Sequence, residues 1–145
     1  KFTQLVPGTD GQKMSKSYNN TIPIFDSEKK IRKMIMRIVT DATDINEPKD
    51  KDTPLFQLYS LFLDEAGQNE LTDRYAEKGL QYGFIKQEFF EKVMDHFGPF
   101  REKREQLVSN PNQVNEILDS GAKKAQIVAD EVLDRVRSAC GITYR

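Results

Sequence analysis

Residues that commonly carry chemistry are scarce in this sequence, which has one cysteine, one histidine and no tryptophan among its 145 residues. The single cysteine, Cys140, excludes a disulfide framework within the chain and is typical of a protein from a reducing compartment. With His96 as the only histidine, the sequence offers no Cys/His metal site and no Ser-His-Asp arrangement. It shows no signal peptide and no apolar run long enough to span a membrane. We therefore expect a cytoplasmic protein with no metal ion held by its side chains.

Apolar residues are also few, since 37% of the chain is hydrophobic and 31% is charged. This balance favours helices with long solvated faces over a β-sandwich or a doubly wound sheet. The length suits one domain, or one domain with an appendage. The chain starts at Lys1 rather than at a methionine, in a transition from apolar residues to a loop. We interpret it as a piece of a longer protein.

The charges are distributed unevenly along the chain. Residues 1–40 carry eight Lys and Arg side chains against three Asp and Glu, a formal charge of +5, although the whole chain carries −1. A basic front end on an acidic body indicates that the front end contacts phosphate groups. The simpler alternative is a basic helix face that is only solvated.

Apolar spacing predicts helices throughout the chain after residue 26. Ile31, Met34, Ile35 and Ile38 recur at intervals of three and four residues, the period of an amphipathic helix. The expected elements are a strand over 2–6 and helices over 27–39, 54–65, 70–79, 83–97, 100–108 and 122–139, with a break or kink at Gly98-Pro99 and a short capped helix or turn over 110–121. The predicted fold class is an all-α helical bundle with a short strand-loop stub in front of it.

Two further patterns concern helix ends and packing. Asp26-Ser27 and Thr53-Pro54 are typical of the residues that begin a helix. The last predicted helix carries a narrow seam of small and β-branched residues, namely Ala122, Ala125, Ala129, Val132, Val136 and Ala139. We expect this seam to pack closely on a neighbouring helix, and the thiol of Cys140 to be packed as well.

The stretch GTDGQKMSKSYNN, residues 8–20, has no apolar period and combines two lysines and two serines with glycines and asparagines. Glycine and asparagine permit the turns of a flexible loop. The pentapeptide KMSKS, Lys13–Ser17, lies at its centre. From composition alone, an exposed loop without a ligand is as good an interpretation as a binding site.

The pentapeptide matches the second signature of class I aminoacyl-tRNA synthetases at every position. The likeness continues in DGQKMSKSYNNTI, in RIVTD, in GFIKQEFFEKV and in the terminal GAKKAQIVADEVLDRVRSACG. Together these segments resemble the tryptophanyl-tRNA synthetase family over nearly the whole chain. The resemblance is weakest in the acidic loop over 41–53.

This resemblance implies a Rossmann-type catalytic domain that ends in the signature loop, followed by a helical domain that helps to bind tRNA. Residues 1–25 would be the end of the catalytic domain, and residues 26–145 the helical domain. The first signature of the family and the amino-acid pocket have no counterpart in the sequence, so we expect the isolated chain to be inactive. The family further implies ATP with Mg²⁺, tryptophan and tRNA(Trp) as partners, and a homodimer of the complete enzyme, with this piece alone as a monomer.

The implied reaction is attack of the tryptophan carboxylate on the α-phosphorus of ATP, with departure of pyrophosphate. Negative charge builds on the phosphate oxygens, so cations that reach them in the transition state accelerate the step. We assign Lys16 as the main pyrophosphate contact and Lys13 as its partner. Ser15 and Ser17 are assigned as positioning donors, and Met14 as the apolar anchor of the loop.

The candidate tRNA contacts are Arg101, Lys103 and Arg104, the densest basic spot in the acidic helical body. Three alternatives to the tryptophanyl interpretation stay open at this point. One is the sister tyrosyl enzyme, and another is a non-catalytic RNA-binding module that uses the basic helix over 27–39. The third is a plain helical interaction domain, which leaves the basic front end unexplained.

Overall fold

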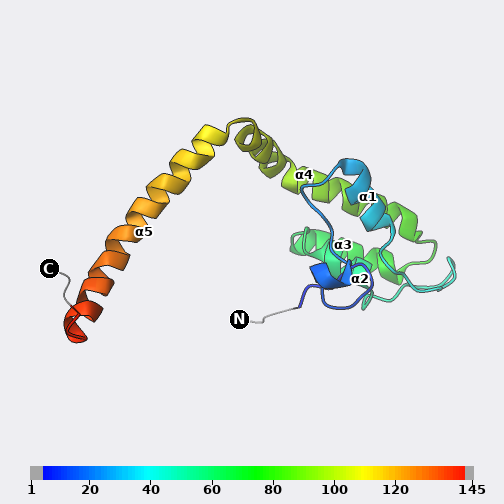
Figure 1. Cartoon of the computed structure of the whole chain (residues 1–145). Helices are drawn as coiled ribbons and strands as arrows, with labels where there is room; N and C mark the ends of the chain where they lie inside the picture. Colours follow the sequence, from blue (N-terminus) through cyan, green and yellow to red (C-terminus); the bar gives the residue numbers. More distant parts are fainter. Residues whose placement is uncertain (1–4, 143–145) are drawn as a thin grey trace. The chain divides into compact units, whose positions relative to one another are not determined.

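The computed structural model describes residues 5–142, and their regular secondary structure is helical (Figure 1). The elements are the 3-10 helix η1 (Lys16–Tyr18) and the α-helices α1 (Glu28–Met36), α2 (Pro54–Ser60), α3 (Glu65–Ala76), α4 (Tyr82–Ser109) and α5 (Pro111–Ala139). Within residues 5–142 no segment forms a β-strand. The all-α fold class is therefore confirmed.

The strand predicted over residues 2–6 is not seen in the part of the chain that the structure describes. Residues 2–4 lie outside that part, and Leu5 and Val6 belong to no strand. An isolated antiparallel bridge joins Pro7 to Lys13. A strand needs neighbouring strands to take up its backbone hydrogen bonds, and one bridge does not supply them.

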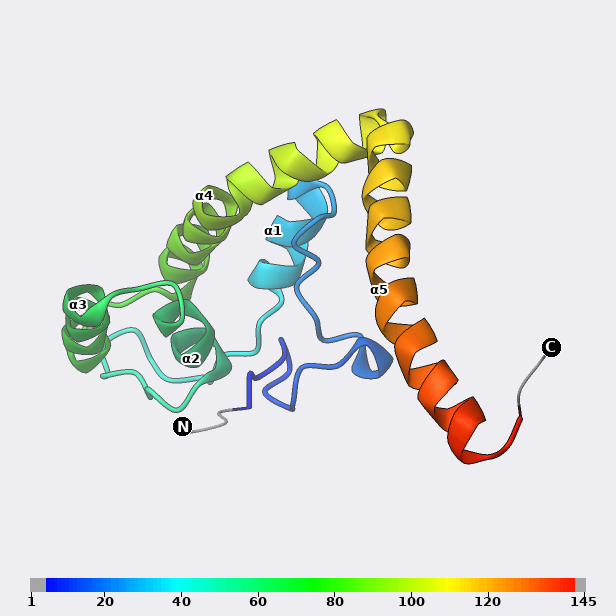
Figure 2. The same cartoon turned by 90° about the vertical axis from the view of Figure 1, so that its left-hand side faces the viewer.

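The chain divides into two compact units, Lys1–Pro99 and Phe100–Arg145. The hydrophobic core lies in the first unit, where Figures 1 and 2 show α1, α2 and α3 alongside the first half of α4. Its buried apolar residues are Ile31, Ile35, Ile38, Leu55, Leu58, Tyr59, Leu71, Tyr75, Ile85, Phe89 and Val93. Burial of each large side chain of this kind contributes about 1.5–3 kcal/mol.

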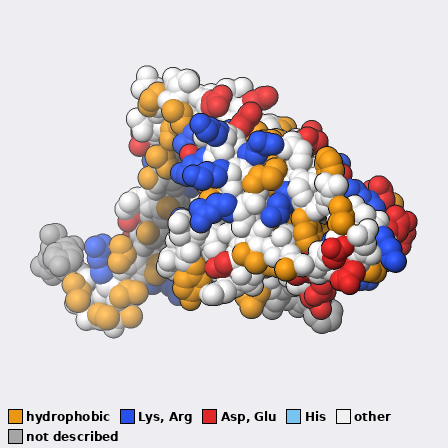
Figure 3. Space-filling model, turned by 90° about the vertical axis from the view of Figure 1, so that its right-hand side faces the viewer, with side chains coloured by type: hydrophobic (Ala, Val, Ile, Leu, Met, Phe, Trp, Pro, Cys, Tyr) orange, Lys and Arg blue, Asp and Glu red, His pale blue; other side chains and the backbone are white. Residues whose placement is uncertain are grey.

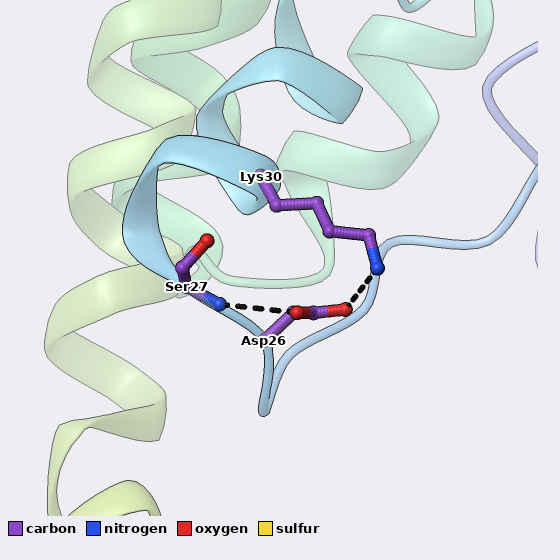
Figure 4. A network of polar contacts seen from close by, with 3 residues as sticks. All are labelled: Asp26, Ser27 and Lys30. Atoms are coloured by element: carbon purple, nitrogen blue, oxygen red, sulfur yellow. Dashed lines mark hydrogen bonds and ion pairs between the residues drawn. The ribbon is translucent and has the colours of Figure 1, made fainter.

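Helix α1 begins where the sequence predicts but ends earlier than residue 39. Its N-cap is Ser27, whose amide donates to Asp26 Oδ1 at 3.3 Å, while Lys30 pairs with the other carboxylate oxygen of Asp26 (Figure 4). At the other end, Lys86 Nζ donates to the carbonyls of Met36 and Ile38 at 3.2 and 2.7 Å. An α4 side chain thus satisfies backbone carbonyls that have no partner within α1 at its C-terminal end.

The next two helices also differ from their predicted bounds. Helix α2 starts as expected, with Thr53 Oγ1 accepting from the Phe56 amide at 3.4 Å, but it ends at Ser60 instead of residue 65. Helix α3 then starts at Glu65 instead of residue 70, because the Asp64 carboxylate caps it by accepting from the Gly67 amide at 2.9 Å. The Asp64 N-cap sets the start of α3. The predicted start at residue 70 lies next to the first apolar residue of the pattern.

Both long helices continue through positions at which a break or a turn was one of the expectations. Helix α4 continues through Pro99 to Ser109, so the Gly98-Pro99 pair does not break it. Helix α5 includes both the predicted turn over 110–121 and the predicted last helix. A glycine such as Gly121 costs a helix interior only about 1 kcal/mol relative to alanine, which the flanking helix formers offset.

Helix α5 contradicts the packing prediction for the small-residue seam. No residue of this helix is buried, and Val132 and Val136 are 48% and 52% exposed. Cys140, expected to be packed, is an exposed free thiol. The spacing predicted an amphipathic helix correctly, but the described side chains of its apolar face are exposed.

The core can be tested with two phenylalanines on the same helix. Phe89 is fully buried and its ring centroid lies 5.6 Å from that of Tyr59 and 5.4 Å from that of Phe62, whereas Phe84 is 64% exposed. We expect Phe89→Ala to lower the free energy of unfolding by about 3–5 kcal/mol because it leaves a cavity. The control Phe84→Ala should change it by less than about 0.5 kcal/mol. Urea unfolding followed by circular dichroism measures both, and similar losses would contradict this core assignment.

Candidate active-site loop

The signature loop is built on a tight turn that begins at Pro7. The Gly8 amide donates to the Gln12 carbonyl at 2.6 Å, and the Met14 amide donates to the Val6 carbonyl at 2.9 Å. Gly11 has a φ of 84°, in the region that favours glycine. These bonds give the segment before KMSKS a defined path.

Asn20 lies at the centre of this loop and is only 2% exposed. Its Oδ1 accepts from the Ser15 amide at 2.7 Å, and its Nδ2 donates to Asp10 Oδ1 at 2.8 Å and to the Lys13 carbonyl at 3.1 Å. Its own carbonyl accepts from the Thr9 amide at 2.9 Å. The sequence indicated only a turn-permitting residue here, so this role was missed.

The two asparagines of the loop differ in function. Asn19 has a φ of 53° and ends η1, which fits the turn role that the sequence suggested for it. Asn20 instead uses its whole side-chain amide inside the loop. Composition cannot distinguish the two, because the distinction lies in which side chain points into the turn.

The two serines of the pentapeptide bond to each other. Ser15 Oγ and Ser17 Oγ lie 2.7 Å apart, and Ser15 Oγ also accepts from the Ser17 amide at 3.3 Å as the N-cap of η1. In this conformation both hydroxyls shape the turn that carries Lys16. Their geometry supports a positioning role exerted through the backbone.

Both lysines of the pentapeptide are exposed, as is Ser17. Neither Lys13 nor Lys16 forms an ion pair within residues 5–142. Met14, between them, is half-buried and packs against the core. The loop therefore has an apolar side turned towards the helices and two ammonium groups accessible to an anionic ligand.

A basic surface lies on the helix that follows the loop. The exposed cations of α1 and its C-cap are Lys29, Lys30, Arg32, Lys33 and Arg37. Arg32 is held by α4, where Gln87 Oε1 accepts from its Nε and Nη2 at 3.2 and 2.9 Å. Figure 3 shows several Lys and Arg side chains gathered on one face of the molecule. The basic front end predicted from the sequence is thus accessible to solvent.

The candidate tRNA contacts lie in the second unit. Arg101, Lys103 and Arg104 occupy the same turn of α4, with Lys103 and Arg104 exposed and Arg101 half-buried. Arg104 also lines an apolar groove of about 430 Å³ between the end of α4 and the start of α5. The three basic side chains are therefore close neighbours on α4.

Neither a metal-binding cluster nor a membrane-spanning helix is found among the described residues. No group of three or more His, Cys, Asp or Glu side chains there is arranged to hold a metal ion. None of the helices in residues 5–142 is long and apolar enough to cross a membrane.

The comparisons with known proteins first identify a class. The family model for tRNA synthetases class I (W and Y) matches residues 2–98, more than half of the 145-residue chain. The chain therefore belongs to this family. KMSKS and the turn that presents it fall within the matched region.

Within that family, the chain is similar to tryptophan enzymes. It is 52% identical over 138 residues to the tryptophan–tRNA ligase of Rhodopirellula baltica, covering 94% of this chain and 43% of that protein. It is 44% identical over 138 residues to the ligase of Fusobacterium nucleatum, covering 95% and 42%. A crystal structure of the tryptophanyl-tRNA synthetase from Campylobacter jejuni complexed with ADP and tryptophan matches with a TM-score of 0.90 at 46% identity, covering 95% of this chain and 44% of that chain.

These relatives support the tryptophanyl interpretation and not the tyrosyl alternative. The chain nevertheless spans less than half the length of the curated relatives it matches. Family membership is a property of this chain, whereas more than half of each of these relatives lies outside the match.

The geometry around Asp10 gives a test of the loop conformation. The pKa of Asp10 is lowered from 3.8, chiefly because its carboxylate accepts a hydrogen bond from the Asn20 side chain. Since the folded pKa lies below the unfolded one, ionised Asp10 stabilises the fold above the unfolded pKa. This contribution is lost as the pH falls through the folded pKa.

We expect Asn20→Ala to raise the pKa of Asp10 towards 3.8, as measured by carboxyl NMR titration of the 145-residue chain. Asp44 is an internal control, because its pKa is lowered by hydrogen bonds from Asn46 and should not change. An unchanged pKa of Asp10 would show that the Asn20 contact is not formed in solution.

Proposed function

We propose that this chain acts as part of a tryptophan–tRNA ligase, which activates tryptophan with ATP and transfers it to tRNA(Trp). The observation that carries the proposal is the KMSKS turn, which presents two exposed lysines on a hydrogen-bonded backbone. The tryptophan specificity rests on the similarity to named tryptophan–tRNA ligases. Such a ligase works in protein synthesis, which also supports a cytoplasmic location.

In the activation step, a carboxylate oxygen of tryptophan forms a bond to the α-phosphorus of ATP. The bond from that phosphorus to the bridging oxygen breaks, and pyrophosphate leaves with the electron pair. Lys16 stabilises the charge that develops on the pyrophosphate, and Lys13 assists it. A lysine is suited to this task because its compact charge on a long stem follows a leaving group as it moves.

The remaining residues of the pentapeptide position these lysines. Ser15 and Ser17 hold the turn through their mutual hydrogen bond, and Met14 anchors it on the core. Mg²⁺ enters with ATP as the counter-ion of its phosphates. We place the end of the catalytic domain in residues 1–25 and the helical domain in residues 26–145.

The catalytic assignment predicts a specific kinetic change in the full-length enzyme. Lys16→Ala removes a contact that strengthens in the transition state, so the activation rate should fall by about 30- to 1000-fold, the equivalent of about 2–4 kcal/mol. The dissociation constant of ATP should change much less. Pre-steady-state formation of the adenylate gives the rate, with Lys78→Ala on the exposed loop before α4 as the control. Equal losses of binding and rate would mean that Lys16 holds ATP without promoting the chemistry.

The RNA assignment predicts the opposite pattern. Charge reversal of Arg101 and Arg104 to glutamate should raise the KM for tRNA severalfold, because phosphate contacts are lost and repulsion is introduced. Tryptophan-dependent pyrophosphate exchange should stay unchanged. The reversal Lys123→Glu and Lys124→Glu on α5 is a matched control for charge alone. A parallel fall in exchange would show that this part of α4 supports the active site and does not serve tRNA.

A further inference from the structure

We infer that Asn20 is a positioning residue for the lysines of the signature loop. Its side chain fixes the backbone on both sides of Met14. It thereby sets the directions in which Lys13 and Lys16 leave the loop. The inference rests on the proposed function, since it concerns the same reaction. Asn20 needs no contact with substrate, because it acts through the two lysines.

The side-chain amide of Asn20 is buried inside the loop. Asn20 is 2% exposed, and its side-chain amide bonds to residues of the loop and to none of the helices. Burying an amide costs free energy unless its polar atoms are bonded. An apolar residue would fill the space without that requirement, so the amide is explained by the geometry it imposes.

The partners of the Asn20 amide also define its orientation. Nδ2 faces two acceptors, the Asp10 carboxylate and the Lys13 carbonyl, whereas Oδ1 faces one donor, the Ser15 amide. Ionised aspartate has acceptors only, so the opposite orientation of the amide would place oxygen against oxygen. Three independent partners therefore select one orientation of Asn20.

The backbone approaches the Asn20 side chain closely at Gly8. A Cβ atom at this position would lie 2.2 Å from Asn20 Nδ2 and 2.3 Å from its Cγ. Only glycine lets the amide reach into the turn. The glycine, the aspartate and the asparagine of this loop thus form one arrangement around a single side chain.

These contacts act directly on the residues that carry the lysines. The Lys13 carbonyl and the Ser15 amide flank Met14, so their bonds to Asn20 fix the chain across the middle of KMSKS. Lys16 is the first residue of η1, which Ser15 caps. A misplacement of about 1 Å in a catalytic group can lower a rate about 100-fold.

The experiment uses the full-length ligase that contains this chain and measures tryptophan-dependent ATP–pyrophosphate exchange. Asn20→Leu keeps the number and branching of the side-chain heavy atoms and removes the three side-chain bonds, and Asn20→Asp places a carboxylate against two acceptors. Both should lower kcat by about 10- to 100-fold with the KM values for ATP and tryptophan within about twofold. The matched control Asn69→Leu, on the exposed face of α3, should change neither parameter.

A double-mutant cycle distinguishes positioning from a general structural role. If Asn20 works through Lys16, the double variant Asn20→Leu/Lys16→Ala should lose much less than the product of the single losses. Losses that multiply would overturn the inference. Asp10→Ala, at an exposed position, should produce a smaller loss in the same direction and should also be less than multiplicative with Asn20→Leu.

The outcomes separate this inference from the proposed function. Absence of exchange in the unmodified full-length protein would contradict the proposed function itself. Normal exchange in that protein, together with unchanged kcat in Asn20→Asp and Asp10→Ala, would contradict the role of Asn20 alone. Thermal unfolding followed by circular dichroism identifies any variant that has lost its fold, and Asp10→Ala then decides the question.

Discussion

One backbone hydrogen bond joins the signature loop to the helical core. The Val39 amide donates to the Thr9 carbonyl at 2.8 Å, and the Thr9 amide donates to the Asn20 carbonyl at 2.9 Å. Val39 directly follows Ile38, which is buried in the core and whose carbonyl accepts from Lys86 at 2.7 Å. The base of the loop is thus connected to α1 and, through α1, to α4. Its position depends on how these two helices pack.

The cations of the first unit fall into two groups that the sequence cannot separate. In one group the charge already has partners within the fold. Arg74 forms a bidentate pair with Glu88, with both distances 2.8 Å, and buried Lys49 donates to two backbone carbonyls. Lys13 and Lys16 are exposed and form no ion pair within residues 5–142. A charged group that is already satisfied offers little to a ligand, so the second group is the one to consider for phosphate.

Features that depend on neighbouring residues could be predicted from the sequence. Features that depend on contacts between residues farther apart could not. The N-cap at Thr53 follows from its own hydroxyl and the proline behind it, and the structure contains that cap. Gly98-Pro99 was expected to break or kink a helix, and α4 continues through it to Ser109, so the break does not occur. The KMSKS motif could be recognised because its five residues are contiguous in the sequence. Asn20 could not, because its role depends on partners five, seven and ten residues away that meet only in the folded turn.

The loop combines an ordered backbone with charged side chains that are not held. This division suits a reaction whose charge distribution changes along its course. If the ammonium groups were fixed by ion pairs, those pairs would have to break before the groups reached a phosphate, and the cost would fall on the transition state. If the backbone were unfixed, each lysine would lose rotamer freedom and main-chain freedom together at the same moment. An ordered turn removes the second cost in advance and leaves the ammonium groups free to strengthen their contacts as the leaving group departs.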